Sequence, residues 1–300
     1  MKKSSPKKIL VILGPTATGK SDLAVKIAKK FKGEIISADS RQVYKGLDIG
    51  TGKITMAEMK GIHHWLLDVV SPKKVFSVAD WKKISQEKIS VIHKRSKLPI
   101  ICGGTGFYIK SIVDNIVLPE VVPKHKLRNE LGAMSIESLQ KLLKKLDRKR
   151  FETIDINNKV RLIRAIEIAK SLGNVPEIKA EKVPYEILQI GLKLEDEELK
   201  KKIHTRLLSR IKKGMIQEAE ELHKKGVSFE RMRELGLEYR YLAMYLQKEI
   251  SKEEMISKLN TEIWHYAKRQ MTWFKRDNRI KWYSPKDTRR IKKEVENFLK

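Results

Sequence analysis

Hydrophobic and polar positions alternate in blocks over the first third of the chain, and each block has the length of a strand or a helix. Short apolar runs, typical of buried parallel strands, lie at residues 9–13, 34–39, 63–70 and 98–104. Residues 22–30 and 77–97 instead place their apolar side chains at helical spacing. Strands that alternate with helices predict a parallel sheet wrapped by helices, with ligands at the carboxyl ends of the strands.

Beyond residue 118 the pattern changes. Residues 120–184 are basic and helical in spacing, with few runs that suggest a strand. The later predicted elements are a strand at 186–194, helical stretches at about 195–226 and 251–277, and a short strand at 279–283. We therefore expect an α/β core that a helical insertion domain interrupts. The segments are 1–119 (first part of the core), 120–184 (insertion) and 185–300 (second part of the core, with basic C-terminal helices).

The composition favours a cytoplasmic protein. No run approaches the roughly 20 apolar residues that span a bilayer, and the apolar run behind the basic residues 1–8 is too short for a secretory signal. The single cysteine, Cys102, excludes an internal disulfide and fits a reducing compartment, where it would be a small buried strand residue. We expect no membrane partner.

The net charge is large and positive. The chain has 65 Lys and Arg against 37 Asp and Glu, a net charge of +28, and the excess is concentrated at residues 121–150 and 264–300. A small metabolite does not require this charge, whereas a polyanion such as RNA would exploit it. The alternative is a source whose proteins are all rich in lysine.

Residues 14–21 carry the strongest motif: Gly, four residues, then Gly-Lys-Ser, between a predicted strand and a predicted helix. Its glycines let backbone N–H groups turn towards one point, and the helix start and Lys20 add positive charge, which suits a polyphosphate. Ser21 could place its hydroxyl on a magnesium ion that bridges phosphate oxygens. The context indicates a P-loop NTPase-like fold, but the motif does not distinguish ATP from other phosphate compounds. The loop residues are Gly14, Pro15, Thr16, Ala17, Thr18, Gly19, Lys20 and Ser21.

Two polar residues follow other predicted strands. Asp39 could serve as a general base or hold magnesium, and the alternative is a turn or helix-cap aspartate. Thr105 follows two glycines that allow a close backbone approach, so it could orient a substrate, or simply cap a helix. Because parallel strands end at one edge of the sheet, both are expected beside the phosphate loop.

Basic residues at helical spacing are the remaining candidates. Arg161 and Arg164 are three residues apart, which suits phosphates or unstacked bases, although a solvated helix face is equally consistent. Arg206 and Arg210, four apart, could close over a phosphate or be surface charge. Residues 264–276 mix aromatic and basic side chains, and we expect most of the aromatic ones in the core and the basic ones at a partner.

Together these segments resemble one family, the tRNA dimethylallyltransferases, also called tRNA isopentenyltransferases. The similar segments occur in family order from residue 9 to about residue 277. They are residues 14–21, 36–40, 43–51, 103–108, 161–167 and 267–270.

The resemblance implies transfer of a dimethylallyl group from dimethylallyl diphosphate to N6 of the adenosine on the 3′ side of the tRNA anticodon, with release of diphosphate. The phosphate loop would hold the donor's diphosphate, with Mg²⁺ as cofactor to neutralise the leaving group. This fits the strand at 98–104, which does not end in the acid that holds magnesium in many ATP-binding relatives of the fold. The insertion would hold the anticodon stem-loop, and the target base would leave its stack. We expect a monomer.

The resemblance also implies roles for single residues. Asp39 would be the general base for the N6 proton, with Thr105 and Lys20 beside it. The diphosphate would be held by Lys20, Ser21, Arg206 and Arg233 together with the loop. The expected tRNA contacts are Asp39, Ser40, Arg41, Gln42, Thr105, Arg128, Val160, Arg161, Leu162, Ile163 and Arg164. The segment 236–240 is longer than the family form, which shifts the register near Arg233, and residues 40–42 differ in detail from common forms.

Three alternatives share part of this pattern. A P-loop kinase for a nucleoside or another small molecule has the loop and the sheet, but does not explain the charge of +28. An isopentenyltransferase that modifies free adenylate would not need the basic insertion. A non-catalytic RNA-binding protein would not need Lys20, Ser21, Asp39 and Thr105 together. ATP turnover, prenylation of AMP, or RNA binding without turnover would identify each in turn.

Overall fold

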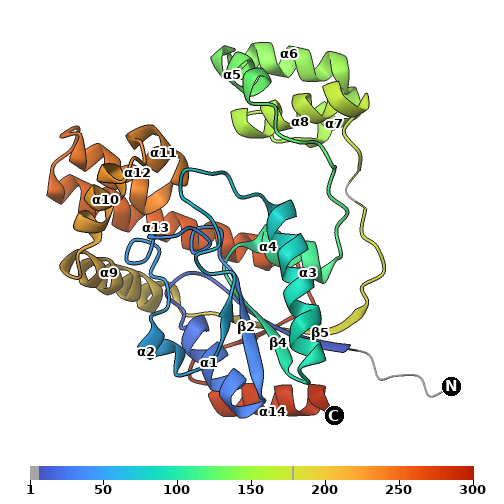
Figure 1. Ribbon diagram of the computed structural model, residues 1–300, viewed down its shortest axis with the longest axis vertical. Coiled ribbons are helices and arrows are strands. Elements are labelled where there is room, and N and C mark those ends of the chain that lie inside the picture. The colour runs from blue at the N-terminus through green and yellow to red at the C-terminus, as the bar shows by residue number, and fades with distance from the viewer. Residues whose placement is uncertain (1–6, 178) are drawn as a thin grey trace. The chain divides into compact units, whose positions relative to one another are not determined.

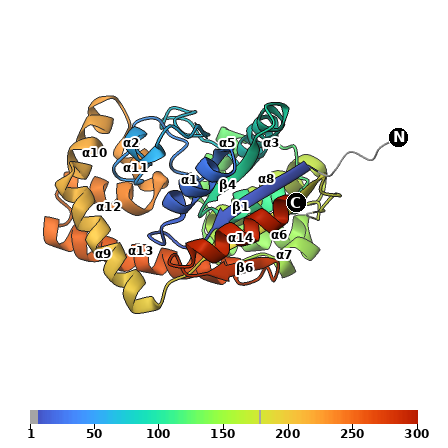
Figure 2. The same ribbon diagram turned by 90° about the horizontal axis from the view of Figure 1, so that it is seen from below.

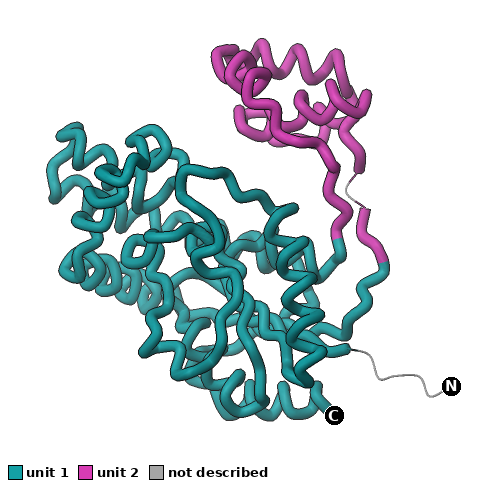
Figure 3. Tube along the Cα trace, in the orientation of Figure 1, with its two compact units in different colours: residues 1–115, 182–300 teal, residues 116–181 magenta. Residues whose placement is uncertain are grey.

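The chain folds into two compact units in the computed structural model, which describes residues 7–177 and 179–300 (Figure 3). Unit 1 comprises residues 1–115 and 182–300, and unit 2 comprises residues 116–181. Unit 2 begins and ends a few residues earlier than the insertion expected at 120–184. Unit 1 is therefore assembled from two stretches of chain that unit 2 separates in the sequence.

Unit 1 is built on a six-stranded parallel sheet with the strand order β3-β2-β4-β1-β5-β6. The strands are β1 (Lys7–Leu13), β2 (Gly33–Ala38), β3 (His64–Trp65), β4 (Leu98–Gly103), β5 (Tyr185–Leu192) and β6 (Ile280–Tyr283). In the register of the sheet, Leu13 lies opposite Gly103 on one side and Gly191 on the other. The ends of three strands therefore meet where the phosphate loop begins, as the P-loop NTPase-like prediction requires.

Helices cover both faces of the sheet because the strand side chains on both faces are apolar and buried. The helices α1 (Lys20–Lys30) and α14 (Thr288–Leu299) pack on one face, where Figure 2 shows them side by side. The other face packs against α3 (Val78–Lys94), α4 (Gly106–Val113) and α13 (Lys252–Phe274). Cys102 of β4 is buried, as expected for a small strand residue.

Further helices extend this second face and gather to one side of the sheet (Figure 1). They are α9 (Asp196–Lys212), α10 (Met215–Lys224), α11 (Phe229–Leu235) and α12 (Leu237–Leu246), while the short α2 (Met56–Met59) follows β2. The stretch expected to be helical at 195–226 is helical, but Gly214, with φ 102°, divides it into α9 and α10. In the described part of the chain, no helix is long and apolar enough to cross a bilayer.

The third predicted strand, at 63–70, is also wrong in length. Only His64 and Trp65 pair with β2, because Leu66 (φ 66°) and Asp68 (φ 54°) take the left-handed conformation and turn the chain out of the sheet. Asp68 therefore lies in a loop, where its carboxylate pairs with Lys53.

Unit 2 is helical throughout its core. Its helices are α5 (His125–Ala133), α6 (Ile136–Leu146), α7 (Arg148–Thr153) and α8 (Lys159–Leu172). They enclose a small apolar core made by Leu131, Leu139, Leu143, Leu162, Ala165 and Ile166. At the base of the unit Ile116 pairs with Ala180 in an antiparallel bridge, and the Val117 N–H donates to the Lys179 carbonyl at 3.0 Å. The chain thus enters and leaves unit 2 at neighbouring residues.

Candidate active site

The phosphate loop connects β1 to α1 through three positive-φ residues. Gly14 has φ 140°, and a Cβ there would lie 2.4 Å from the Leu192 carbonyl oxygen, so this position accepts only glycine. Ala17 (φ 63°) and Gly19 (φ 83°) are left-handed as well. Within the described residues no side chain caps the start of α1, so its first N–H groups remain available to a ligand. Such a helix start attracts anions.

A cavity of about 310 Å³ opens beside this loop. It brings the loop together with the turn after β2, with α2 and with α9. Its lining residues are Ala17, Gly19, Lys20, Ser21, Asp22, Gly52, Ile54, Glu58, Lys202 and Arg206. Lys20 and Arg206, which the sequence assigned to a diphosphate, therefore share one cavity although 186 residues separate them.

Both of these cations lack an acidic partner. Lys20 folds back on the Pro15 carbonyl, and Arg206 donates to the Gly52 carbonyl at 3.2 Å; within the described residues neither forms an ion pair. Loss of hydration lowers the pKa of Lys20 to about 8. Loss of hydration, together with the neighbouring Arg210, lowers the pKa of Arg206 to about 10. Two partly dehydrated cations facing one cavity favour an anionic ligand, because the ligand would supply the missing countercharge.

Arg210 behaves differently from Arg206, one helical turn away. Its guanidinium pairs with Glu238 at 3.0 Å and donates to the Gly50 carbonyl at 3.2 Å. The two arginines therefore do not close over a phosphate as a pair. Arg210 supports the loop that contains Gly50, and Arg206 remains for a ligand.

Asp39 and Thr105 lie together at the ends of β2 and β4. The Asp39 Oδ1 accepts the N–H groups of Arg41 (2.8 Å) and Gln42 (3.3 Å), while its Oδ2 accepts no hydrogen bond from the part of the chain that the structure describes. The Thr105 hydroxyl accepts the Ser40 N–H at 3.0 Å. The turn after Asp39 thus fixes one carboxylate oxygen and leaves the other without a partner among the described residues.

The segment at residues 43–51 supports the cavity in a way that the sequence analysis missed. Three successive N–H groups, of Asp48, Ile49 and Gly50, donate to the Glu218 carboxylate of α10 at 2.6 to 2.9 Å. The Tyr239 hydroxyl also donates to it, at 2.6 Å. This anchoring holds the chain that leads to Gly52 in the cavity wall. The two glycines of the segment, Gly46 and Gly50, were the available signal in the sequence. The acidic partner, Glu218, lies about 170 residues away.

Arg233 was expected at the diphosphate and does not line this cavity. Its guanidinium, on α11, pairs with Glu249 and donates to the Gln247 side chain at 2.7 Å. Glu249 neutralises the charge of the guanidinium, and Gln247 accepts a hydrogen bond from it. Arg233 is therefore a structural contact between α11 and the end of α12.

The candidate RNA residues of unit 2 divide into structural and exposed groups. Glu167 is fully buried, and Arg128 holds it with two hydrogen bonds of 3.0 and 2.7 Å. Arg164 pairs with Glu167 and also donates to the Val121 carbonyl at 3.0 Å. Leu162 is fully buried, Ile163 packs against the same core, and Val160 and Arg161 remain exposed. Leu162 is therefore a core residue and the Arg164 guanidinium is already held within unit 2, while RNA contact by either residue stays a prediction.

The aromatic residues of α13 separate in the same manner. Phe274 is buried, as expected for the core. Trp264 is only half-buried, and the ammonium groups of Lys200 (5.2 Å) and Lys268 (5.4 Å) lie over its ring. Such cation–π contacts keep two lysines together at the surface of unit 1.

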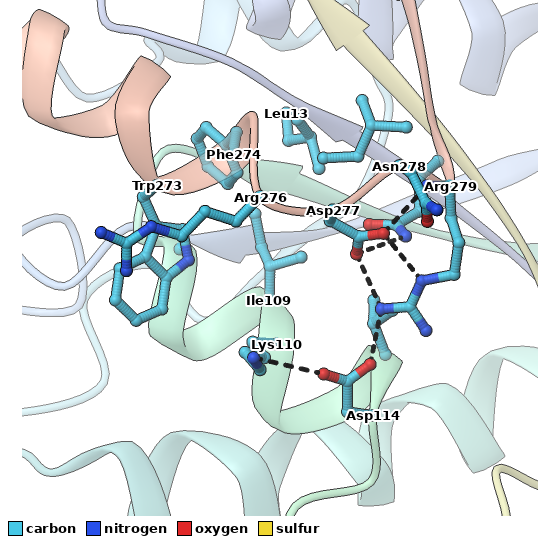
Figure 4. Close-up of a pocket in the computed structure, with 14 residues that line it drawn as sticks. Leu13, Ile109, Lys110, Asp114, Trp273, Phe274, Arg276, Asp277, Asn278 and Arg279 are labelled. Atoms are coloured by element: carbon cyan, nitrogen blue, oxygen red, sulfur yellow. Dashed lines mark hydrogen bonds and ion pairs between the residues drawn. The ribbon is translucent and has the colours of Figure 1, made fainter. Parts of the chain in front are cut away.

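A second cavity of unit 1, of about 300 Å³, lies between α4 and the chain that follows α13 (Figure 4). Most of its charged residues are paired: Arg279 pairs with Asp114 at 2.6 Å and with Asp277 at 2.7 Å. Unlike the phosphate-loop cavity, it does not present two unpartnered cations to a ligand.

The parallel sheet, the loop at its central strand and the unpaired cations define a P-loop NTPase-like protein. The chain belongs to the IPP transferase family, whose model matches residues 42–277. It is 44% identical over 272 residues to "tRNA dimethylallyltransferase 2" of Treponema denticola, covering 89% of this chain and 91% of that protein. It is 36% identical over 304 residues to the tRNA dimethylallyltransferase of Halalkalibacterium halodurans, covering 97% and 96%.

Solved structures give the same result. The full-length tRNA isopentenylpyrophosphate transferase of Bacillus halodurans matches with a TM-score of 0.74 and 35% identity, over 97% of this chain and 96% of that one. A eukaryotic dimethylallyltransferase described as acting on tRNA also matches with a TM-score of 0.74, at 26% identity, over 89% of this chain and 69% of that one. These findings place the chain among prenyltransferases rather than among kinases.

Proposed function

We propose that this prenyltransferase moves a dimethylallyl group from dimethylallyl diphosphate to N6 of the adenosine on the 3′ side of a tRNA anticodon. The observation that best supports a diphosphate donor is the pair of cations without an acidic partner, Lys20 and Arg206, around the cavity of about 310 Å³. The curated relatives, all named for a dimethylallyl transfer to tRNA, support both the donor and the acceptor.

In the proposed reaction, the N6 lone pair forms a bond to C1 of the allyl group. The bond from C1 to the diphosphate oxygen breaks, and its electron pair leaves with diphosphate. The N6 proton passes to the free Oδ2 of Asp39, which is needed because the N6 lone pair is shared with the ring. Lys20, Arg206 and the N–H groups at the start of α1 stabilise the charge that develops on the leaving group.

Mg²⁺ fits this site mainly as a partner of the diphosphate. The described residues contain no group of three or more His, Cys, Asp or Glu side chains that would hold a metal alone. The cavity does offer the Ser21 hydroxyl and the Asp22 carboxylate, and Mg²⁺ commonly uses one or two such ligands together with substrate phosphates. The ion would neutralise negative charge on the departing diphosphate.

The positive charge of the protein supports tRNA as the acceptor. A net charge of +28 suits a long polyanion. Arg161, which is exposed beside Asp155 at 3.5 Å, and the exposed Lys268 present positive charge to phosphates. We propose that unit 2 holds the anticodon stem-loop, that the target adenosine leaves its stack to reach Asp39 and Thr105, and that the protein acts as a cytoplasmic monomer.

The test is transfer of labelled dimethylallyl diphosphate to an anticodon stem-loop RNA that has three adenosines on the 3′ side. Wild-type protein should label the RNA, and Asp39→Asn should reduce kcat by about 100- to 10,000-fold while leaving the affinity for inorganic pyrophosphate unchanged. ATP hydrolysis or phosphoryl transfer without labelled RNA would instead support the kinase alternative.

A further inference from the structure

Gln270 of α13 bridges the two loops of the candidate active site. Its side chain is only 6% exposed. The Oε1 atom accepts the Thr16 N–H at 2.9 Å, and the Nε2 atom donates to the Gly104 carbonyl at 2.9 Å. Thr16 belongs to the phosphate loop, and Gly104 precedes Thr105 in the loop after β4. One amide side chain therefore connects the donor half of the site to the acceptor half.

The surroundings leave little freedom to this bridge. A Cβ at Gly104 would lie 2.2 Å from the Nε2 of Gln270, so the bridge depends on a glycine at that position. One helical turn to either side of Gln270, Ala267 and Phe274 are buried in the main core and fix that face of α13. An amide side chain both accepts and donates without carrying a charge, as this bridge requires.

The connection continues to the proposed base. Gly104 is followed by Thr105, whose N–H donates to the Ala38 carbonyl and whose hydroxyl accepts the Ser40 N–H, each at 3.0 Å. Asp39 lies between these two contacts in the sequence. A shift of Gln270 would therefore move the phosphate loop relative to Asp39.

We propose that Gln270 is a positioning residue that sets the distance between the donor's diphosphate and the attacking nitrogen of the acceptor. This inference rests on the proposed function. Misplacement of reacting groups by about 1 Å can reduce a rate by about 100-fold, so a residue that touches neither substrate can still control the transfer.

The first test compares Gln270→Met with Gln189→Met. Gln189 is a matched control: it is a buried glutamine of unit 1, 3% exposed, and it donates to Asp277 at 3.1 Å, outside this site. We expect Gln270→Met to lower kcat by about 10- to 100-fold, whereas Gln189→Met should retain wild-type kcat. Equal kcat values in the two variants, both folded by thermal melting, would overturn the proposal.

The second test uses Gln270→Glu, which keeps the shape of the side chain. A protonated carboxyl can donate to the Gly104 carbonyl and accept from the Thr16 N–H, as the amide does, whereas the ionised form cannot donate. The ratio of variant to wild-type kcat should therefore rise as pH falls, by up to about tenfold per pH unit above the carboxyl's pKa. A ratio independent of pH would contradict the proposal even if Gln270→Met failed to fold.

Binding of inorganic pyrophosphate separates this inference from the proposed function. Gln270→Met should weaken it by about fivefold through the lost support of the Thr16 N–H, and this result does not depend on which acceptor the enzyme uses. If wild-type protein transferred nothing to RNA but the pyrophosphate effect appeared, the proposed reaction would be wrong and the bridge would stand. Unchanged pyrophosphate affinity would count against the bridge itself.

Discussion

Basic side chains serve opposite purposes in the two units. In unit 2, Arg128 and Arg164 both pair with the fully buried Glu167. In unit 1, Lys20 and Arg206 face a cavity without any carboxylate partner among the described residues. Dehydrated charge without a partner is costly, so it persists where a ligand supplies the countercharge. The pairing of a basic residue therefore distinguishes a structural cluster from a binding site better than its position on a helix.

The largest effect should follow from removing the countercharge in unit 2. Glu167→Gln leaves Arg128 and Arg164 without their buried partner, which should cost about 3 to 5 kcal/mol of stability within unit 2. Hydrogen exchange of α5 and α8 should report this loss, while pyrophosphate affinity should stay unchanged. Normal protection of both helices in the variant would show that the pairing does not stabilise the unit.

The same carboxylate sets an acid limit for unit 2. Burial alone would raise the pKa of Glu167, but hydrogen bonds from Arg128, from the Lys124 N–H and from Arg164 hold it at about 2. Because the folded pKa is lowered, this stability is present above the unfolded value near 4.5 and is lost as pH falls towards 2. Exchange protection in α8 should decline over that window in wild-type protein and show less dependence on pH in Glu167→Gln.

Removing a cation from unit 1 should have the opposite pattern. Lys20→Met should weaken pyrophosphate binding by about 100-fold, since it removes a charged hydrogen bond to the ligand. It should not lower the melting temperature, because the ammonium has no acidic partner to lose. A clear drop in the melting temperature of the free protein would show that Lys20 is structural.

We expect a smaller loss of pyrophosphate affinity from a change at Arg206, and a matched change in unit 2 serves as its control. Arg206→Met should weaken pyrophosphate binding by about tenfold with little change in stability. Arg128→Met should do the reverse, lowering the stability of unit 2 and leaving pyrophosphate binding intact. Calorimetry measures the affinity of each variant and thermal melting its stability. Equal responses of the two variants would contradict the distinction between paired and unpaired cations.

The smallest effect is the pH dependence of donor binding. The lowered pKa of Lys20, about 8, means that its ammonium is present below this pH and is lost above it. Pyrophosphate affinity should therefore decline as pH rises through about 8, and binding near that pH should take up a proton. Calorimetry in buffers of different ionisation enthalpy measures this uptake, and Lys20→Met should reduce it to the part that the titration of pyrophosphate itself contributes.

The sequence predicted those parts of the site that local pattern controls. The phosphate loop, Asp39 and Thr105 each follow a buried strand, and parallel strands that end at one edge brought them together. The helical character of unit 2 followed from its spacing in the same way. Family membership and the P-loop NTPase-like fold were confirmed by the comparisons.

What could not be predicted depends on partners far apart in the sequence. Gln270 meets Thr16 across 254 positions, and Glu218 meets Gly50 across 168, so no local periodicity contains either contact. The family resemblance placed Arg233 at the diphosphate, and no local pattern shows its partner Glu249, which lies beyond its own helix. In the same way, local pattern does not show that two arginines surround Glu167.

The antiparallel bridge between Ile116 and Ala180 has a consequence for how such a protein can change over time. Because the insertion starts and finishes at adjacent points, shortening or exchanging it alters only the length of one connection between α4 and β5. Closing a connection of different length costs little, since the entropy of a loop grows slowly with its size. Unit 2 can therefore diverge, grow or be replaced while the sheet of unit 1 keeps its strand order.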